Sequence, residues 1–224
     1  MRLLFEPHTS GAIKIAPYAG YLSLTLVFVR DLEHMHAEQE NKVRDAYAAY
    51  SENKLYLAFD LYGQLADAGH VESQVFLAWM LSQGIGCTKS EAQAAVYFER
   101  AAALGNPLGC FYFGRWLTRA GEHQRAYGFY LRGAESKYLP SMFRVGYSLA
   151  RGKGVAVDLL RAYEILKTAA VQGHAFALRE IAVQDLRGGR GPLWIPVGIL
   201  EFVAAFFWGV VVSMFNKNSD LLRG

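Results

Sequence analysis

The sequence predicts an all-α protein, in which a right-handed α-solenoid of helix–turn–helix repeats is followed by one C-terminal transmembrane helix. Two observations predict this fold class. A pattern of small and large residues recurs through the middle of the chain every 32 or 36 residues, and a long apolar run follows it. The chain has 224 residues, which is enough for one such domain and a shorter extra segment.

The composition excludes several classes of protein. Hydrophobic residues make up 53% of the chain and charged residues only 19%, so a disordered or acidic protein is excluded. The net charge is only +3 and no run of Lys or Arg occurs, so we expect no nucleic-acid partner. Two cysteines, Cys87 and Cys110, are too few for a disulfide framework.

Residues 1–36 form an N-terminal segment whose structure the sequence leaves open. The segment lacks the features of a signal peptide, because Glu6, Pro7 and His8 stand where an apolar core is required. Residues 15–29 form an uncharged run that is short for a membrane span. Their pattern is compatible with a strand, a buried arm that caps the next domain, or a segment that contacts the membrane.

The repeat domain is predicted over residues 37–192. Its second helices carry an alanine, a large residue and a small residue at positions i, i+4 and i+8, which lie on one face of a helix. These triplets are Ala58/Tyr62/Ala66, Ala94/Phe98/Ala102, Ala126/Tyr130/Ala134 and Ala162/Leu166/Ala170. The first helices carry a matching series of small residues, which is Ala46, Ala78, Gly114, Gly146 and Ala182.

Glycines mark the ends of the repeats. Gly69, Gly105 and Gly173 follow the second helices at the position where a left-handed residue stops a helix, and Lys137 is the exception. Because a single helix pair cannot bury its apolar face alone, successive pairs must stack on one another.

This pattern resembles the Sel-1-like repeat family, a relative of the tetratricopeptide repeats. The resemblance is carried by the helix ending at 169–173 (AAVQG) and by the loop at 152–155 (GKGV), with Asp158 and Ala162 after it. It is strongest over 141–173. The resemblance implies an adaptor that holds protein complexes together, often at membranes.

The resemblance also implies that the first helices line a groove for a partner protein. The residue after each small position would point into this groove, and further aromatic residues would lie one turn earlier. Exposed aromatic residues and arginines commonly anchor interfaces. The predicted groove residues are Tyr47, Trp79, Phe111, Arg115, Phe143 and Tyr147. The alternative is that some of these side chains pack between helices.

Residues 193–215 (LWIPVGILEFVAAFFWGVVVSMF) are predicted to form the transmembrane helix, and residues 216–224 a short polar tail. Glu201 is the only charged residue in the apolar run. At a rise of about 1.5 Å per residue, the run is long enough for a hydrocarbon core about 30 Å thick. The alternative, a buried core helix, is seldom so long and so uniformly apolar.

Two features of this run predict how it is used. Glu201, Ala205 and Gly209 share one face, which favours packing against an integral membrane protein or a homodimer through this helix. The alternative is a lone acid that the bilayer tolerates by local thinning. Basic residues before the run outnumber those after it, so the repeat domain is expected in the cytoplasm, at a bacterial inner membrane.

No group of residues predicts catalysis or a cofactor. Gly152 and Lys153 lack the first glycine and the Ser or Thr of a phosphate-binding loop. His34 and His36 have acidic neighbours but no fixed metal geometry. Neither cysteine has a His or Asp partner in its surroundings that predicts a nucleophile. We therefore predict no enzyme, no cofactor and no metal site.

The sequence thus predicts a membrane-anchored scaffold that assembles or stabilises a membrane-associated complex. Its repeats would hold a soluble partner or a loop of an integral membrane protein. The alternative is a membrane regulator whose groove senses a peptide or small ligand and whose apolar helix dimerises in response.

Overall fold

The computed structural model describes residues 37–187, 191 and 194–215, although the surroundings of Gly209 and of residues 212–215 lie outside the description. The described residues form helices joined by short loops. The helices are residues 37–51, α2 (Leu55–Asp67), α3 (Val71–Gln83), α4 (Glu91–Ala103), α5 (Pro107–Arg119), α6 (His123–Glu135), α7 (Leu139–Arg151), α8 (Leu159–Val171), α9 (Ala175–Leu186) and α10 (Ile195–Phe215).

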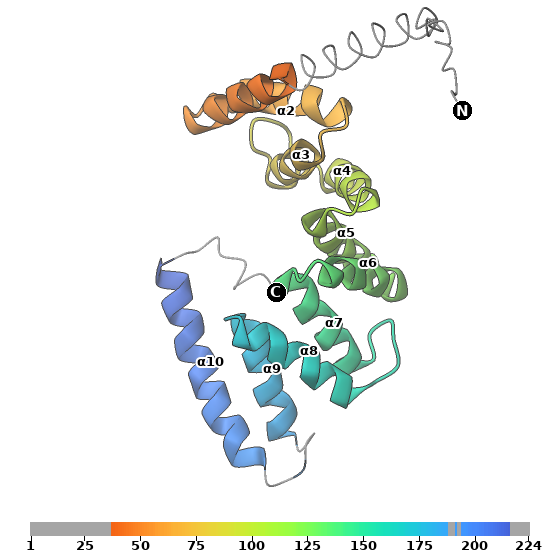
Figure 1. Ribbon diagram of the computed structural model, residues 1–224, viewed down its shortest axis with the longest axis vertical. Coiled ribbons are helices and arrows are strands. Elements are labelled where there is room, and N and C mark those ends of the chain that lie inside the picture. Colours follow the sequence, from red (N-terminus) through yellow and green to blue (C-terminus); the bar gives the residue numbers. More distant parts are fainter. Residues whose placement is uncertain (1–36, 188–190, 192–193, 216–224) are drawn as a thin grey trace, which may run out of the picture.

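The helices stack pair upon pair into a curved solenoid (Figure 1). Helix α3 packs on α4, α5 on α6, α7 on α8 and α9 on α10, and each pair contacts the next. The first helices of successive pairs also approach one another, because α5 contacts α7 and α7 contacts α9. The first helices therefore line the inner side of the curve. This arrangement confirms the all-α solenoid that the repeat pattern predicts.

The small and large residues of the pattern fit together inside each repeat. A Cβ atom on Gly114 would lie 2.7 Å from Cε1 of Tyr130, and one on Gly146 would lie 2.6 Å from Cγ of Leu166. These two positions of the first helices therefore leave no room for a side chain. The large residues of the second helices are all buried, namely Tyr62, Phe98, Tyr130 and Leu166.

The extra residues of the longer repeats form a loop that packs on the preceding repeat. Gly86 and Gly154 have positive φ angles of 66° and 77°. A Cβ on either glycine would lie 2.2 Å from a backbone carbonyl oxygen, that of Leu55 for Gly86 and that of His123 for Gly154. The loops thus rest against the start of α2 and of α6, and they tie successive repeats together.

The second residue after each second helix keeps the same conformation even where glycine is missing. Gly105 and Gly173 have φ angles of 83° and 90°, and Lys137 has a φ angle of 57°. After Gly69, Gly105 and Gly173 the next residue caps the following first helix with its side chain, whereas Tyr138 after Lys137 does not. His70 and His174 each accept a hydrogen bond at Nδ1 from the backbone N–H three residues later, at 3.2 Å. The repeat therefore accounts for both histidines.

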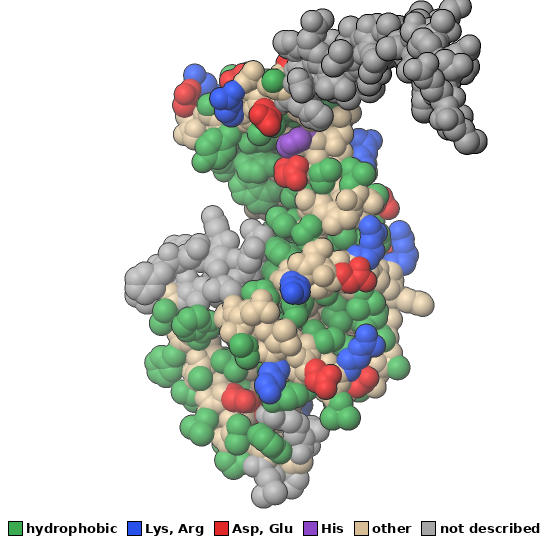
Figure 2. All heavy atoms as spheres, in the orientation of Figure 1, with side chains coloured by type: hydrophobic (Ala, Val, Ile, Leu, Met, Phe, Trp, Pro, Cys, Tyr) green, Lys and Arg blue, Asp and Glu red, His purple; other side chains and the backbone are tan. Residues whose placement is uncertain are grey.

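Helix α10 is the second helix of the last pair (Figure 1). Gly198 permits close contact with α9, since a Cβ there would lie 2.8 Å from Cβ of Asp185. Ala205 is buried, and Nε1 of Trp208 donates a hydrogen bond to the carbonyl oxygen of Gly173 at 2.9 Å. The opposite face of α10 is exposed, and hydrophobic side chains gather over it in the space-filling view (Figure 2).

This packing differs from the predicted transmembrane helix over 193–215. Within the parts of the chain that the structure describes, no helix is both long and apolar enough to cross a membrane. In the described structure, small residues of α10 seat one of its faces on α9. The predicted N-terminal segment 1–36, with its run at 15–29, and the tail at 216–224 lie outside the described residues.

Candidate functional site

The candidate site is the inner face of the solenoid, which is formed by the helix at 37–51 together with α3, α5, α7 and α9. Four of the six predicted groove residues reach its surface. Tyr47 is 66% exposed, whereas Trp79, Arg115 and Tyr147 are half-buried.

Phe111 and Phe143 do not line the groove, because they are only 0% and 4% exposed. Their rings fill the space beneath the start of the next first helix. Phe111 contacts the ring of Tyr138 at a centroid distance of 5.7 Å, and Phe143 stacks on His174 at 5.1 Å. For these two residues the alternative prediction, packing between helices, is the correct one.

The N-terminal end of the inner face is aromatic. The indole of Trp79 lies 6.1 Å from the ring of Tyr50 and 5.3 Å from that of Phe76. Phe76 in turn contacts the buried ring of Tyr62 at 4.4 Å. Trp79 is thereby held in one place and remains partly exposed, which is the property of an interface anchor.

The middle of the inner face is cationic. Helices α5 and α7 contain no acidic residue, and their arginines are Arg115, Arg119, Arg144 and Arg151. Arg119 pairs with Glu91 at 2.5 Å and Arg151 pairs with Glu180 at 2.8 Å. Among the described residues, Arg115 and Arg144 form no ion pair.

Aromatic rings hold these two guanidinium groups in place of carboxylates. The Arg115 guanidinium lies over the rings of Phe111 and Tyr112 at 5.7 and 6.0 Å, and that of Arg144 lies over Phe143 at 5.9 Å. Burial, and then the positive charges of Arg144 and Arg119, lower the pKa of Arg115. Because arginine stays protonated in proteins, this lowering reflects first the cost of burying a charged group and then the repulsion from the two neighbouring arginines.

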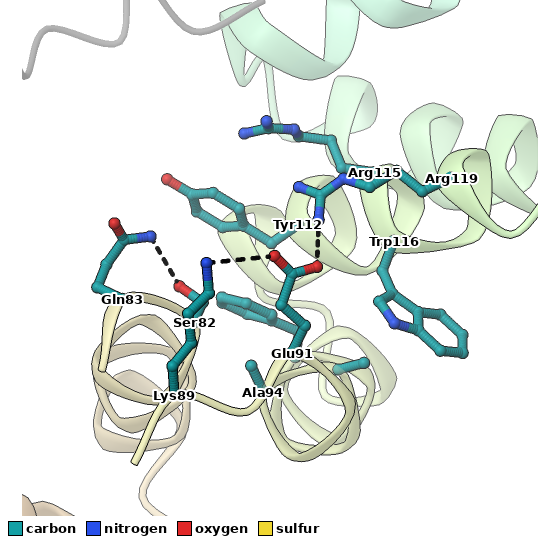
Figure 3. A pocket seen from close by; sticks show the side chains of 11 residues that line it. Ser82, Gln83, Lys89, Glu91, Ala94, Tyr112, Arg115, Trp116 and Arg119 are labelled. Atoms are coloured by element: carbon teal, nitrogen blue, oxygen red, sulfur yellow. Dashed lines mark hydrogen bonds and ion pairs between the residues drawn. The ribbon is translucent and has the colours of Figure 1, made fainter. Parts of the chain in front are cut away.

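A small pocket of about 140 Å³ opens beside this cluster. Figure 3 shows Glu91 between Lys89 and Arg119, whereas the side chain of Arg115 is directed away from this ion-paired group. The carboxylate of Glu91 is therefore engaged by two cations and leaves the charge of Arg115 uncompensated. The lining residues include Ser82, Gln83, Lys89, Glu91, Tyr112, Arg115, Trp116 and Arg119.

The C-terminal end of the inner face is closed by a buried ion pair. Nε and Nη2 of Arg151 donate to Oε1 of Glu180 at 3.0 and 2.8 Å, and Glu180 is 2% exposed. This pair joins α7 to α9. The ring of Tyr147 lies 5.4 Å from the Arg151 guanidinium and 6.0 Å from Nζ of Lys153, so it contacts two cations.

The other chemical groups considered in the sequence are accounted for by the fold. Within the described residues, no three His, Cys, Asp or Glu side chains could hold a metal ion, and His34 and His36 lie outside them. Burial raises the pKa of Cys87 and of Cys110, which lowers the fraction of reactive thiolate at neutral pH. Gly152 ends α7 with a φ angle of 66°.

The sequence predictions missed Tyr112, Arg119 and Arg144. A signal for all three was present, because Tyr112 and Arg119 lie three and four residues from Arg115, on the same side of α5. Arg144 stands in the same relation to Tyr147. The prediction used one position per repeat, whereas the exposed strip of each first helix includes two or three.

The residues predicted to pack against another membrane helix lie on α10. Glu201 is half-buried and its Oε2 atom is buried, and Ala205 is 5% exposed. They fall on the side of the helix that Gly198 seats on α9, so this side is already covered by the chain's own repeats. The surroundings of Gly209 lie outside the description.

Two segments of the chain match the Sel1 repeat family, at residues 71–106 and 139–174. They correspond to the pairs α3/α4 and α7/α8, which have the longer loops. Sel1-repeat proteins generally mediate protein–protein interactions. Among proteins of curated function, none matches this chain.

Solved structures have a similar fold. A protective antigen of uropathogenic Escherichia coli that displays an SLR fold is 18% identical, with a TM-score of 0.68 over 87% of this chain and 44% of the antigen. This chain therefore spans less than half the length of that protein. A Sel1 repeat protein from Oxalobacter formigenes is 24% identical, with a TM-score of 0.61 over 80% of both chains. Two segments of the chain thus match the Sel1 repeat, and the chain has the all-α solenoid fold of these structures.

Proposed function

We propose that this chain is a membrane-associated scaffold, which holds a partner protein on its inner face and rests on a lipid bilayer through the outer face of α10. The observation that carries this proposal is the exposed apolar surface of α10. Its exposed large side chains, apart from Trp208, are Ile195, Ile199, Leu200, Phe202, Val203, Phe206, Phe207, Val210 and Val211. This set is the outer face of α10.

The outer face is large, continuous and uncharged. Phe206 and Phe207 are 64% and 63% exposed and contact each other at 5.9 Å. Glu201, the one charged residue of α10, lies on the opposite side of the helix. Monomeric soluble proteins rarely expose a contiguous apolar patch of this kind unless it binds something.

Contact with a lipid bilayer is more favourable for these apolar side chains than contact with water. A helix whose apolar face is buried about 5–10 Å into the boundary between headgroups and acyl chains lies parallel to the membrane. With one side seated on α9, α10 would present its outer face to one leaflet without crossing it. The basic residues before α10, among them Arg179 and Arg187, favour the cytoplasmic leaflet of a bacterial inner membrane.

The inner face would then hold the partner protein near the membrane. Trp79 and Tyr147 are partly exposed aromatic residues at its two ends, and arginines lie between them. A cytoplasmic loop of an integral membrane protein would be within reach of this surface. Such an arrangement would assemble or stabilise a complex at the bilayer.

Flotation with lipid vesicles tests the membrane contact. The full chain is mixed with vesicles of anionic and zwitterionic phospholipids and separated on a density gradient, and we expect it to float with the lipid. The double variant Val203→Glu/Phe206→Glu should stay at the bottom. The loss follows because each large side chain contributes about 1.5–3 kcal/mol when buried, and a carboxylate is costly in the apolar layer.

Leu160→Glu is the matched control, because Leu160 is 80% exposed near the start of α8, and α8 packs on α7 and α9. This variant should float like the unchanged chain. Equal flotation of all three proteins, or of none, would contradict the membrane contact. Sedimentation of the chain without lipid tests whether a second copy of the chain covers the outer face of α10. A dimer that is dissociated by V203E/F206E would identify this second copy as the occupant of that face.

A further inference from the structure

We propose that the inner face selects an extended acidic segment of its protein partner, with carboxylates that pair with Arg115 and Arg144. The inference rests on the proposed function, because it names the chemistry of the segment that the inner face holds. It concerns neither the bilayer contact nor the outer face of α10.

The first step concerns which charges are already neutralised. On α5 and α7, Arg119 is paired with Glu91 and Arg151 with Glu180. Arg115 and Arg144 have no carboxylate partner within the described residues, and both side chains are half-buried. Two half-buried like charges on neighbouring helices repel each other, and an anion between them would relieve that repulsion.

The second step concerns preorganisation. Both guanidinium groups are stacked on aromatic rings, Arg115 over Tyr112 and Arg144 over Phe143. In addition, Nε of Arg144 is buried and has no hydrogen-bond acceptor in the described structure. The fold thus fixes both side chains by packing on aromatic rings, and neither forms an ion pair with a described residue. A planar guanidinium held in this way binds a carboxylate with little further loss of conformational freedom.

The third step concerns spacing. Helices α5 and α7 contact each other at only a few residues, so their axes lie at or somewhat beyond the separation of about 8–10 Å that is usual for packed helices. An extended chain advances about 3.3 Å per residue, so side chains two or three positions apart span about 7–10 Å. A segment that runs along the inner face would therefore place acidic residues two or three positions apart on Arg115 and Arg144. Trp79 lies further along the same face and offers an aromatic contact to an apolar residue.

The observations favour a protein carboxylate over a nucleic acid. Binding to nucleic acid depends on a track of cations that contact many phosphates. Of the four arginines on α5 and α7, two are already paired with carboxylates, Arg119 with Glu91 and Arg151 with Glu180, so no continuous track of cations is available among the described residues of these helices. The whole chain has a net charge of only +3.

Fluorescence anisotropy with synthetic peptides tests the inference. The probe is a labelled peptide of eight residues in which Glu and Phe alternate, and the comparison peptide has Gln in place of every Glu. We expect the full chain to bind the Glu peptide at least tenfold more tightly than the Gln peptide. The preference should weaken as salt is added, because charged pairs near the surface are screened.

Arg115→Gln and Arg144→Gln should each reduce the affinity for the Glu peptide about tenfold, in line with the loss of one charge-assisted hydrogen-bonded pair. Arg161→Gln on α8 is the matched control. It removes the same charge from an exposed position of a second helix and should leave the affinity unchanged. Circular dichroism spectra that match the unchanged chain show that each variant is folded.

Three results would overturn the inference. The first is equal binding of the Glu and Gln peptides, which would leave the inner face as a protein-binding surface without a preference for acid. The second is loss of affinity in R161Q equal to that in R115Q and R144Q, and the third is displacement of the Glu peptide by a single-stranded oligonucleotide at lower concentration than by unlabelled peptide. None of these results affects vesicle flotation, so failure here and failure of the membrane contact are distinguishable.

Discussion

Replacement of Gly114 by alanine tests how the repeats pack. Gly114 lies inside α5, where alanine is favoured over glycine by about 1 kcal/mol of helix propensity. The new Cβ would, however, lie 2.7, 3.0 and 3.1 Å from Cε1, Cδ1 and Cζ of Tyr130. Carbon atoms in favourable contact are about 3.5–4.0 Å apart. The substitution therefore forces the Tyr130 ring to move.

The ring has little room in which to move. Tyr130 is 2% exposed, its hydroxyl oxygen lies 3.0 Å from Oγ1 of Thr118, and its ring faces Phe111 at 6.3 Å. Overpacking of a core in this way costs about 1–3 kcal/mol. After the gain in propensity, we expect Gly114→Ala to lower the free energy of unfolding by about 1 kcal/mol.

Gly128→Ala provides the matched control. Gly128 lies inside α6, and a Cβ there would have no atom within 4 Å, so only the gain in propensity of up to about 1 kcal/mol applies. Urea unfolding followed by circular dichroism should therefore shift the two midpoints in opposite directions, with unchanged slopes. A shift of both midpoints in the same direction would refute the fit between Gly114 and Tyr130.

Three further predictions concern single positions. Lys137→Gly should raise the free energy of unfolding by about 1 kcal/mol in urea melts, because lysine is strained at a φ angle of 57°, whereas Lys137→Ala should not stabilise the chain. Arg151→Met should lower it by about 3 kcal/mol, since the Glu180 carboxylate is left buried without its cation; a loss below about 1 kcal/mol would show that water reaches this carboxylate. Because burial raises the pKa of Cys87, its alkylation at neutral pH should be slower than that of free cysteine and should accelerate at higher pH. Cys110 is buried and should react only when the chain unfolds. Alkylation rates that rise with pH for Cys87 and with denaturant for Cys110 would support both predictions.

The repeat fold was predictable because its rules are local. A small residue on one helix contacts a large residue on the next helix of the same repeat, so the two are close in sequence, as Gly146 and Leu166 are. The end of each second helix is also set by residues close in sequence. Lys137 adopts the same left-handed conformation as the glycines at this position, because the rest of the repeat imposes it. Patterns of this kind need no knowledge of distant contacts.

The inner face was only partly predictable, because exposure depends on the next repeat. Phe111 and Phe143 have the residue type and spacing of groove anchors, yet Tyr138 and His174 cover them. Whether Arg115 has an ion-pair partner depends on how Glu91, from another helix, is engaged. Such information lies in the tertiary contacts and leaves no trace in the spacing of one helix.

The apolar run at the C-terminus shows a different limit. Hydropathy is averaged around the whole circumference of a helix, whereas packing uses one side of it. Gly198 and Ala205 are seven residues apart and so lie on one stripe, which seats α10 on α9, and Glu201 falls between them. The opposite side carries Phe206 and Phe207, and exposure of such side chains to water costs about 1.5–3 kcal/mol each relative to burial. A helix with these two sides is suited to a boundary between folded protein and an apolar phase, because one side is covered by the repeats and the other presents only apolar side chains.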